Sequence, residues 1–160
     1  MLNIIFSFVS SIATAASAII AAIALFKTLK TQKEIQQVQI KQNTIDAFNI
    51  LQNEVLDKLV LVDKKNAKII VDSLDNEECR CAYRNYKSLI ARLDHFAIGI
   101  KHKIYDLDVV NELAGEHIIY LYDKIEPIIC EANKKENQIK HYSNFVALVN
   151  RLKKLGGIDK

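Results

Sequence analysis

The pattern of hydrophobic and polar positions divides the chain into two regions near Phe26. From Leu2 to Phe26 no side chain is ionisable, and IIFSFVSSIATAASAIIAAIALF consists mostly of Ile, Ala, Phe and small hydroxyl residues. A helix over this segment rises about 37 Å at about 1.5 Å per residue, more than the roughly 30 Å hydrocarbon core of a bilayer. We therefore predict a transmembrane helix over residues 1–26.

Two alternatives to an uncleaved anchor are a cleaved secretory signal and a helix that lies on the membrane surface. The stretch ATAAS offers small residues of the kind that a signal peptidase accepts. However, no Lys or Arg precedes the apolar run, the run is longer than the core of a usual signal, and the positive charges follow it. The pattern therefore favours the anchor.

The excess of positive charge directly follows the apolar segment. The formal net charge is +3 at pH 7. Between Phe26 and Gln42 only Glu34 is acidic, and the basic residues are Lys27, Lys30, Lys33 and Lys41. We expect these lysines to form a membrane-surface basic cluster, because positive charge next to a span marks its cytoplasmic side. The prediction is a single-pass protein of the cytoplasmic membrane, with the N-terminus outside and the C-terminal domain in the cytoplasm.

Small residues recur along one face of the predicted membrane helix, at four-three-four spacing. They are Ser11, Ala15, Ala18 and Ala22. Such a face lets two helix backbones approach closely within lipid. We therefore expect self-association through this face, the alternative being that alanine is simply common in membrane helices.

After Phe26 the pattern becomes that of a soluble helix. No glycine precedes Gly99, so the membrane helix should continue through a basic juxtamembrane stalk, residues 27–44, to about residue 62. Apolar residues recur there at intervals of three and four: Val38, Ile45, Phe48, Val55, Leu59 and Val62. This stripe either packs on the chain's own domain or pairs between subunits as a parallel coiled coil. The first interpretation is favoured beyond Ile45.

Further helices are predicted between residues 75 and 155. Asp75 with Glu78 has the spacing of a capping box, and Asp106 is a candidate cap for the next helix. Pro127 should kink or restart that helix near Ile125. Gly115 should allow a neighbouring element to approach closely.

The charged stretch 133–141 is predicted to be a loop. Ser143 should cap a last helix, which ends at Gly156 and Gly157. No strand pattern occurs. The predicted fold class is all-α: a single N-terminal transmembrane helix that continues into a stalk helix, then a small cytoplasmic helical bundle over residues 45–155 and a tail over 156–160.

No motif predicts catalysis, a cofactor or a metal. Cys79, Cys81 and Cys130 lack the spacing of a zinc site and are typical of reduced cytosolic thiols. His95 and His102 lie about 10 Å apart along a helix, too far for one ion. Phosphate-binding glycine loops, the nucleophile elbow and the Arg-to-His spacing of HEPN ribonucleases are absent. The six tyrosines lack an adjoining basic patch, which argues against nucleic acid.

The segment from Tyr86 to Leu152 resembles an uncharacterised prokaryotic and phage family of small proteins. Its marks are Asp94 to Gly99, Tyr105 with Asp106, Gly115, and Ile125 to Ile129. The resemblance implies one N-terminal span and a helical cytoplasmic domain. It implies no active-site residue.

Three functions fit these observations. The leading hypothesis is a membrane-anchored interaction or scaffolding module at the cytoplasmic face, which self-associates and binds a protein partner. One alternative is a membrane-acting effector, for example in phage defence, that oligomerises through its transmembrane helix. The other is an enzyme with an unrecognised helical site, which a polar pocket around Asp94 and His95 would favour.

Overall fold

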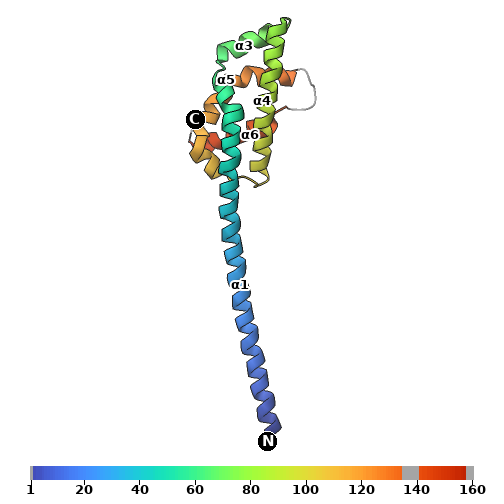
Figure 1. Ribbon diagram of the computed structural model, residues 1–160, viewed down its shortest axis with the longest axis vertical. Helices are drawn as coiled ribbons and strands as arrows, with labels where there is room; N and C mark the ends of the chain where they lie inside the picture. The colour runs from blue at the N-terminus through green and yellow to red at the C-terminus, as the bar shows by residue number, and fades with distance from the viewer. Residues whose placement is uncertain (1, 135–140, 158–160) are drawn as a thin grey trace. The chain divides into compact units, whose positions relative to one another are not determined.

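The structure is a computed structural model that describes residues 2–134 and 141–157, and of residues 2–16 and Ala18 it describes the backbone alone. All regular elements among these residues are helical (Figure 1). They are α1 (Leu2–Leu51), the π-helix η1 (Gln52–Leu56), α2 (Asp57–Val60), α3 (Lys64–Asp72), α4 (Glu77–Lys101), α5 (Leu107–Lys134) and α6 (Ser143–Leu155). The predicted all-α class is confirmed.

The chain divides into two compact units, Met1–Gln39 and Ile40–Lys160. The first contains only helix α1, and its described apolar side chains are exposed. Ala22 is among them, whereas Ser11, Ala15 and Ala18 have side chains that lie outside the described residues. In the part of the chain that is described, no helix is both long and apolar enough to cross a membrane. The transmembrane span over residues 1–26 therefore stays a prediction.

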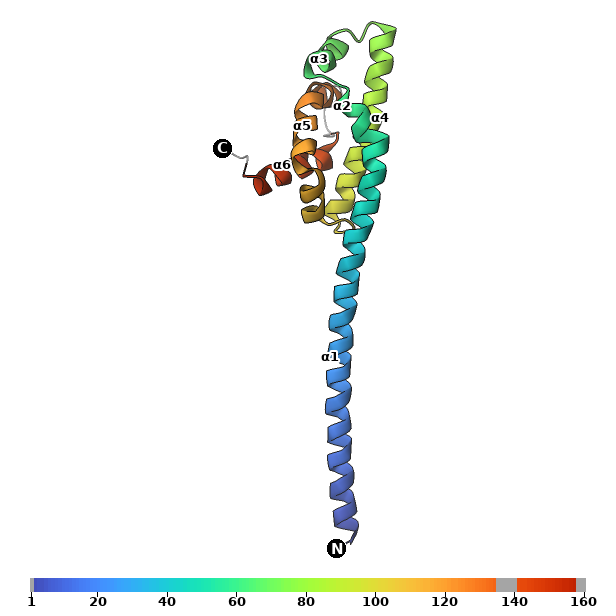
Figure 2. The same ribbon diagram turned by 60° about the vertical axis from the view of Figure 1, so that its left-hand side comes forward.

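The second unit contains the hydrophobic core. The C-terminal part of α1 lies alongside α4 in both views, α3 packs on α5, and α6 packs on α4 and α5 (Figure 2). Core side chains such as Leu59, Ile90 and Phe145 are completely buried. Because the core draws on every helix from the end of α1 to α6, this unit can bring side chains of different helices together in one site.

The apolar stripe of α1 has two different environments. Val38 is 68% exposed, whereas Phe48 and Val55 are 3% and 1% exposed. Leu51, not Gln52, occupies the buried face between Phe48 and Val55, which explains why a polar residue interrupted the predicted stripe. Beyond Ile45 the stripe packs on its own domain, as the sequence favoured.

Helix α4 begins one residue later than the predicted capping box. Asn76 is the N-cap, and its side-chain oxygen accepts hydrogen bonds from the backbone N–H groups of Glu78 (2.8 Å) and Cys79 (3.4 Å). The extended backbone of Asn76 suits an N-cap, and asparagine is as good a cap as aspartate. The prediction that Asp75 caps this helix was wrong by one position, and α3 is a separate short helix before it.

The start of α5 was predicted correctly, whereas the helix does not restart at Pro127. A kink near Ile125 stays a prediction. Asp106 Oδ1 accepts hydrogen bonds from the backbone N–H groups of Asp108 (2.9 Å) and Val109 (3.2 Å). The helix continues through Pro127, and its non-helical residue is Ala114 (φ −159°). The three atoms nearest to a Cβ built at Gly115 all belong to the side chain of Asn111, four residues earlier, and not to a neighbouring element as predicted.

Helix α6 obtains its cap from another helix. Ser143 is the first helical residue, and Tyr142 before it is left-handed (φ 59°). Asp94 on α4 accepts a hydrogen bond from the N–H of Phe145 at 2.8 Å. The predicted Ser143 cap was therefore wrong, because a distant carboxylate satisfies this helix end. Gly156 and Gly157 end the helix as expected, and the central part of the loop predicted over 133–141 lies outside the described residues.

Candidate functional site

The site begins with an irregular turn of the first helix. In the π-helix Gln52–Leu56 the backbone widens, and the N–H of Asp57 donates to the carbonyl of Gln52, five residues earlier. Val55 and Leu56 are both buried there, each 1% exposed. Single π-helical turns within α-helices frequently mark functional sites. The side chains that this turn presents toward α4 are therefore candidates for a functional site.

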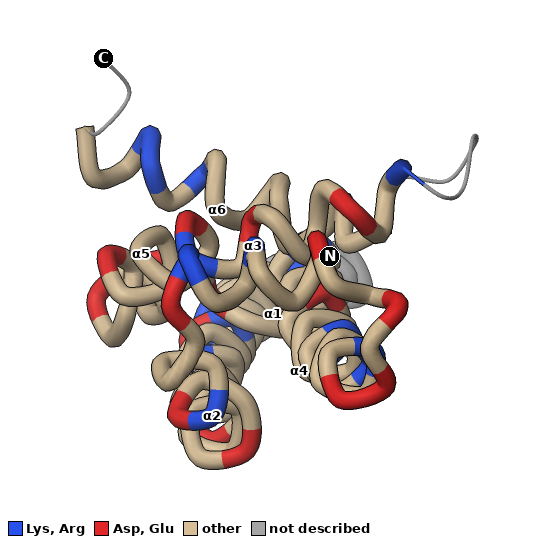
Figure 3. The backbone as a smooth tube through the Cα atoms, turned by 90° about the horizontal axis from the view of Figure 1, so that it is seen from above, with Lys and Arg blue, Asp and Glu red and all other residues tan. Residues whose placement is uncertain are grey.

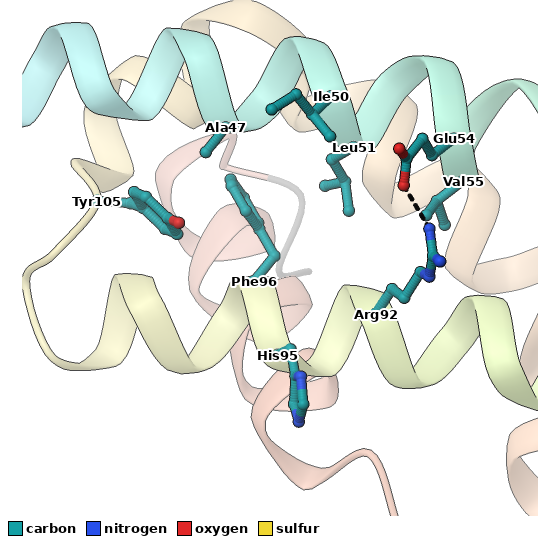
Figure 4. Close-up of a pocket in the computed structure, with 9 residues that line it drawn as sticks. All are labelled: Ala47, Ile50, Leu51, Glu54, Val55, Arg92, His95, Phe96 and Tyr105. Atoms are coloured by element: carbon teal, nitrogen blue, oxygen red, sulfur yellow. Dashed lines mark hydrogen bonds and ion pairs between the residues drawn. The ribbon is translucent and has the colours of Figure 1, made fainter.

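One of these side chains is Glu54, which forms an ion pair with Arg92 of α4 (Figure 4). Both side chains are more than half exposed, at 54% for Glu54 and 56% for Arg92. An ion pair this accessible contributes between about 0 and 1 kcal/mol, since water competes for both charges. A charged ligand can therefore replace either partner of this ion pair at a low cost in free energy.

Aromatic rings form the opposite end of the site. Phe96 stacks on Tyr105 with ring centroids 5.0 Å apart, and Phe48 contacts Phe96 at 6.3 Å. Tyr105 crosses α4 at Gly99, where an added Cβ would lie 2.4 Å from two ring carbons. Glycine at this position is what lets the tyrosine ring lie against the helix.

A buried hydroxyl anchors the chain next to Tyr105. Thr44 is completely buried, and its Oγ1 donates to the carbonyl of Ile40 at 2.7 Å. The same oxygen accepts a hydrogen bond from the N–H of Asp106 at 2.8 Å. These two bonds use the hydroxyl as both donor and acceptor, so burial leaves it satisfied. They fix the position of the α4–α5 turn on α1.

Between the ion pair and the aromatic pair lies a groove of about 380 Å³. Figure 4 shows Phe96 and Arg92 extending from α4 toward α1, and His95 directed away from it. Ile50, on the rim, is 60% exposed. The residues that line this α1–α4 groove are Ala47, Ile50, Leu51, Glu54, Val55, Arg92, His95, Phe96 and Tyr105. Its floor is apolar and one end carries both signs of charge, which suits an amphipathic side chain or segment.

The titratable groups with shifted pKa values lie outside the groove. No cluster of three His, Cys, Asp or Glu side chains that could hold a metal ion occurs among the described residues. Burial, and secondarily the charge of Glu131, raises the pKa of Tyr83. Burial, and secondarily Glu126, also raises the pKa of Tyr122. Neither tyrosine lines the groove, and a raised pKa keeps each phenol protonated as a hydrogen-bond donor.

The predicted site residues lie elsewhere. Ala22 and all four lysines of the basic cluster are exposed. None of the four lysines takes part in an ion pair between described residues. Asp94 caps α6 by accepting from the N–H of Phe145, whereas His95 lines the α1–α4 groove. Sequence reasoning missed Glu54 and Arg92, because 38 residues separate them and no local pattern connects them.

These features define a small all-α protein whose helical domain presents one apolar, charge-flanked groove in its described part. The chain belongs to the family described as domain of unknown function DUF4760, which matches residues 11–152. The expected resemblance to an uncharacterised family is thereby confirmed, and it covers more than the segment from Tyr86 to Leu152. No curated protein and no solved structure matches the chain significantly.

Proposed function

We propose that this protein is a single-pass, membrane-anchored interaction module. Its N-terminal helix is seated in the cytoplasmic membrane with the N-terminus outside, and the helical domain binds a protein partner at the cytoplasmic face. Self-association through Ser11, Ala15, Ala18 and Ala22 belongs to the same proposal. The observation that carries it is the contrast between apolar side chains without cover in the first unit and a closed core in the second.

The exposed apolar side chains support attachment to lipid. Ile19, Ile20 and Ile23 are 61–67% exposed, and Phe26 is 73% exposed. Soluble proteins rarely leave contiguous apolar surface of this extent uncovered. Lys27, Lys30 and Lys33 follow directly and have no ion pair with a described residue, so they are free to meet anionic headgroups.

The distribution of charge supports a protein partner for the domain and argues against nucleic acid. Residues 42–160 contain equal numbers of acidic and basic side chains. Figure 3 shows the two signs mixed over the helices of the second unit. A nucleic-acid surface would need a basic face. The α1–α4 groove offers instead the apolar floor and charged end that suit a protein side chain.

Membrane attachment is tested by adding charge to the predicted span. We expect wild-type protein to stay in the membrane pellet after an alkaline carbonate wash. The double variant Ile12→Lys, Ala16→Lys should move to the supernatant, because these positions lie near the middle of the predicted span, where each lysine costs about 2.5–3.5 kcal/mol. The matched control is Ile35→Lys, Val38→Lys, whose positions are 60% and 68% exposed beyond the lysines. Release of the wild type, or equal release of the control, would refute the anchor.

The interaction part is tested with a photocrosslinking amino acid at position 50, on the groove rim. We expect ultraviolet light to link it in cells to a second copy or to another protein, which mass spectrometry identifies. Position 61 serves as the control, since Leu61 is 83% exposed and does not line the groove. Equal crosslinking from both positions, or none from position 50, would remove the groove as the binding surface.

A further inference from the structure

The α1–α4 groove carries one charge of each sign on its opposite walls. Among the described residues that line it, Glu54 on α1 is the only acidic one, and the basic ones are Arg92 and His95 on α4 (Figure 4). The side chains of Glu54 and Arg92 are both more than half exposed. A carboxylate accepts up to about four hydrogen bonds and a guanidinium donates about five, so one ion pair leaves most of this capacity free. Each charge can therefore bind a further group of the opposite sign.

The presence of both signs restricts the kind of partner that fits the groove. A purely acidic surface would be attracted by Arg92 and repelled by Glu54, and a purely basic surface would meet the reverse. A complementary surface has to present an acidic and a basic group side by side, at the spacing of this ion pair. A second copy of the chain presents both groups at that spacing. Charge complementarity therefore favours a second copy over a partner of one charge sign.

The directions of α1 and α4 allow two copies to meet symmetrically. The two helices run in opposite directions along the groove (Figures 1 and 2), and Glu54 and Arg92 lie at the same level because they contact each other. In a two-fold dimer residue i contacts residue j of the other copy, and j contacts i. A two-fold axis that runs along the groove places α1 of each copy over α4 of the other. Glu54 of each copy then faces Arg92 of the other.

The same symmetry covers the exposed apolar side chain on the rim of the groove. Ile50 is 60% exposed and lies four residues before Glu54 on α1. On α4, which runs the other way, Phe96 lies four residues after Arg92. Figure 4 accordingly shows Ile50 close to the level of His95 and Phe96 along the groove. The two-fold axis thus brings Ile50 of each copy against His95 and Phe96 of the other, and burial of this apolar side chain favours association.

The symmetry also sets the direction in which the two chains run. With the axis along the groove, the two copies of α1 are parallel, and α1 and α4 of both copies form a four-helix arrangement with antiparallel neighbours. Two chains inserted in one membrane need to enter their helical domains in the same direction, as these do. Every contact of the arrangement lies within the second unit, Ile40–Lys160, so none depends on where the N-terminal unit lies.

We propose that the partner of the α1–α4 groove is a second copy of this chain, held by ion pairs between Glu54 of each copy and Arg92 of the other, with Ile50 packed over Phe96. This rests on the proposed function, in which the groove is the protein-binding surface, and it names the partner. The contact joins the helical domains and is separate from the small-residue face of the predicted membrane helix. Each copy supplies one acidic and one basic group to the other.

The test follows a crosslink from position 50 while the two charges are reversed. Two full-length chains with different tags are produced together in cells, and one carries a photocrosslinking amino acid at position 50. We expect wild-type chains to give a product that contains both tags, joined at α4 of the second copy. Glu54→Arg in both chains, or Arg92→Glu in both, should lower the yield of this product at least about tenfold, because like charges then face each other.

The decisive arm combines the two reversals in different chains. When one chain carries Glu54→Arg and the other Arg92→Glu, both facing pairs again contain opposite charges, and the yield should return close to that of the wild type. The ion pair within each chain stays broken, so a purely intramolecular role predicts no recovery. The matched control is Lys64→Glu in both chains, which breaks the ion pair with Glu126 (3.2 Å) between α3 and α5, outside the groove, and should leave the yield unchanged.

The outcomes separate this inference from the proposed function. If position 50 links only to a different protein, the second copy is refuted while the groove stands as a binding surface. A two-tag product that resists both charge reversals, or that does not recover in the mixed pair, refutes the exchanged ion pairs. If position 50 links to nothing, the groove fails as a binding surface and the pairing fails with it. Circular dichroism of each variant verifies that the helices are retained.

Discussion

The two units of this protein contain the same types of apolar residue but bury them to opposite extents. Ile23 in the first unit is 63% exposed, whereas Ile90 in the second is completely buried. The first unit's described side-chain hydrogen bonds are also local, as in Thr28 Oγ1 to the carbonyl of Ala24. In the second unit such bonds join distant segments, as Thr44 and Asp94 do. The first therefore depends on its surroundings for cover, and the second supplies its own.

The largest effect expected from this contrast is on stability. Ile90→Ala should lower the free energy of unfolding of the helical domain by about 2–5 kcal/mol, because it removes core contacts and leaves a cavity. Ile23→Ala, the same change in the first unit, should alter it by no more than about 0.5 kcal/mol. Urea unfolding in one detergent, followed by circular dichroism, measures both. Comparable losses would show that the first unit packs against the second.

A smaller loss of stability is expected when a contact between distant segments of the second unit is removed. Asp94→Ala should cost about 1–2 kcal/mol, since it uncaps α6 and removes the acceptor for Phe145 N–H and for Nδ2 of Asn144. Asp94→Asn, which retains one acceptor oxygen, should cost less. Asp57→Ala is the control, because no hydrogen bond or ion pair of the Asp57 side chain occurs among the described residues. Equal losses in the free energy of unfolding for Asp94→Ala and Asp57→Ala would show that the Asp94 cap does not stabilise α6.

Local sequence signals predicted most of the fold. The three-and-four spacing of apolar residues located the long helices, and Asp106, Gly156 and Gly157 marked helix ends correctly because their preferences act within one turn. The errors at Asp75 and Ser143 have different causes. At the first, two adjacent residues are equally good caps, and at the second the cap comes from Asp94, which lies 51 residues from Phe145.

The candidate site was less predictable than the fold. The α1–α4 groove depends on Glu54 meeting Arg92 and on Tyr105 lying against Gly99, and only the packing of helices establishes the first of these contacts. Gly99 was the more accessible clue, since it stands inside a strong helical pattern where glycine is unfavourable. A glycine in such a place indicates that another group passes close to the backbone.

The widened turn at Gln52–Leu56 places a constraint on how the gene for this protein can vary in length. One residue added to or removed from a helix rotates the part before the change by about 100° relative to the part after it. Between Thr44 and Leu51, before the widened turn, such an insertion or deletion would move Phe48 or Leu51 off the buried face that it now occupies. A residue removed within the widened turn would instead restore α-helical spacing and leave both flanking faces in place. Residues 27–39 have exposed side chains throughout and contact no core, so there the helix can gain or lose residues without disturbing the domain.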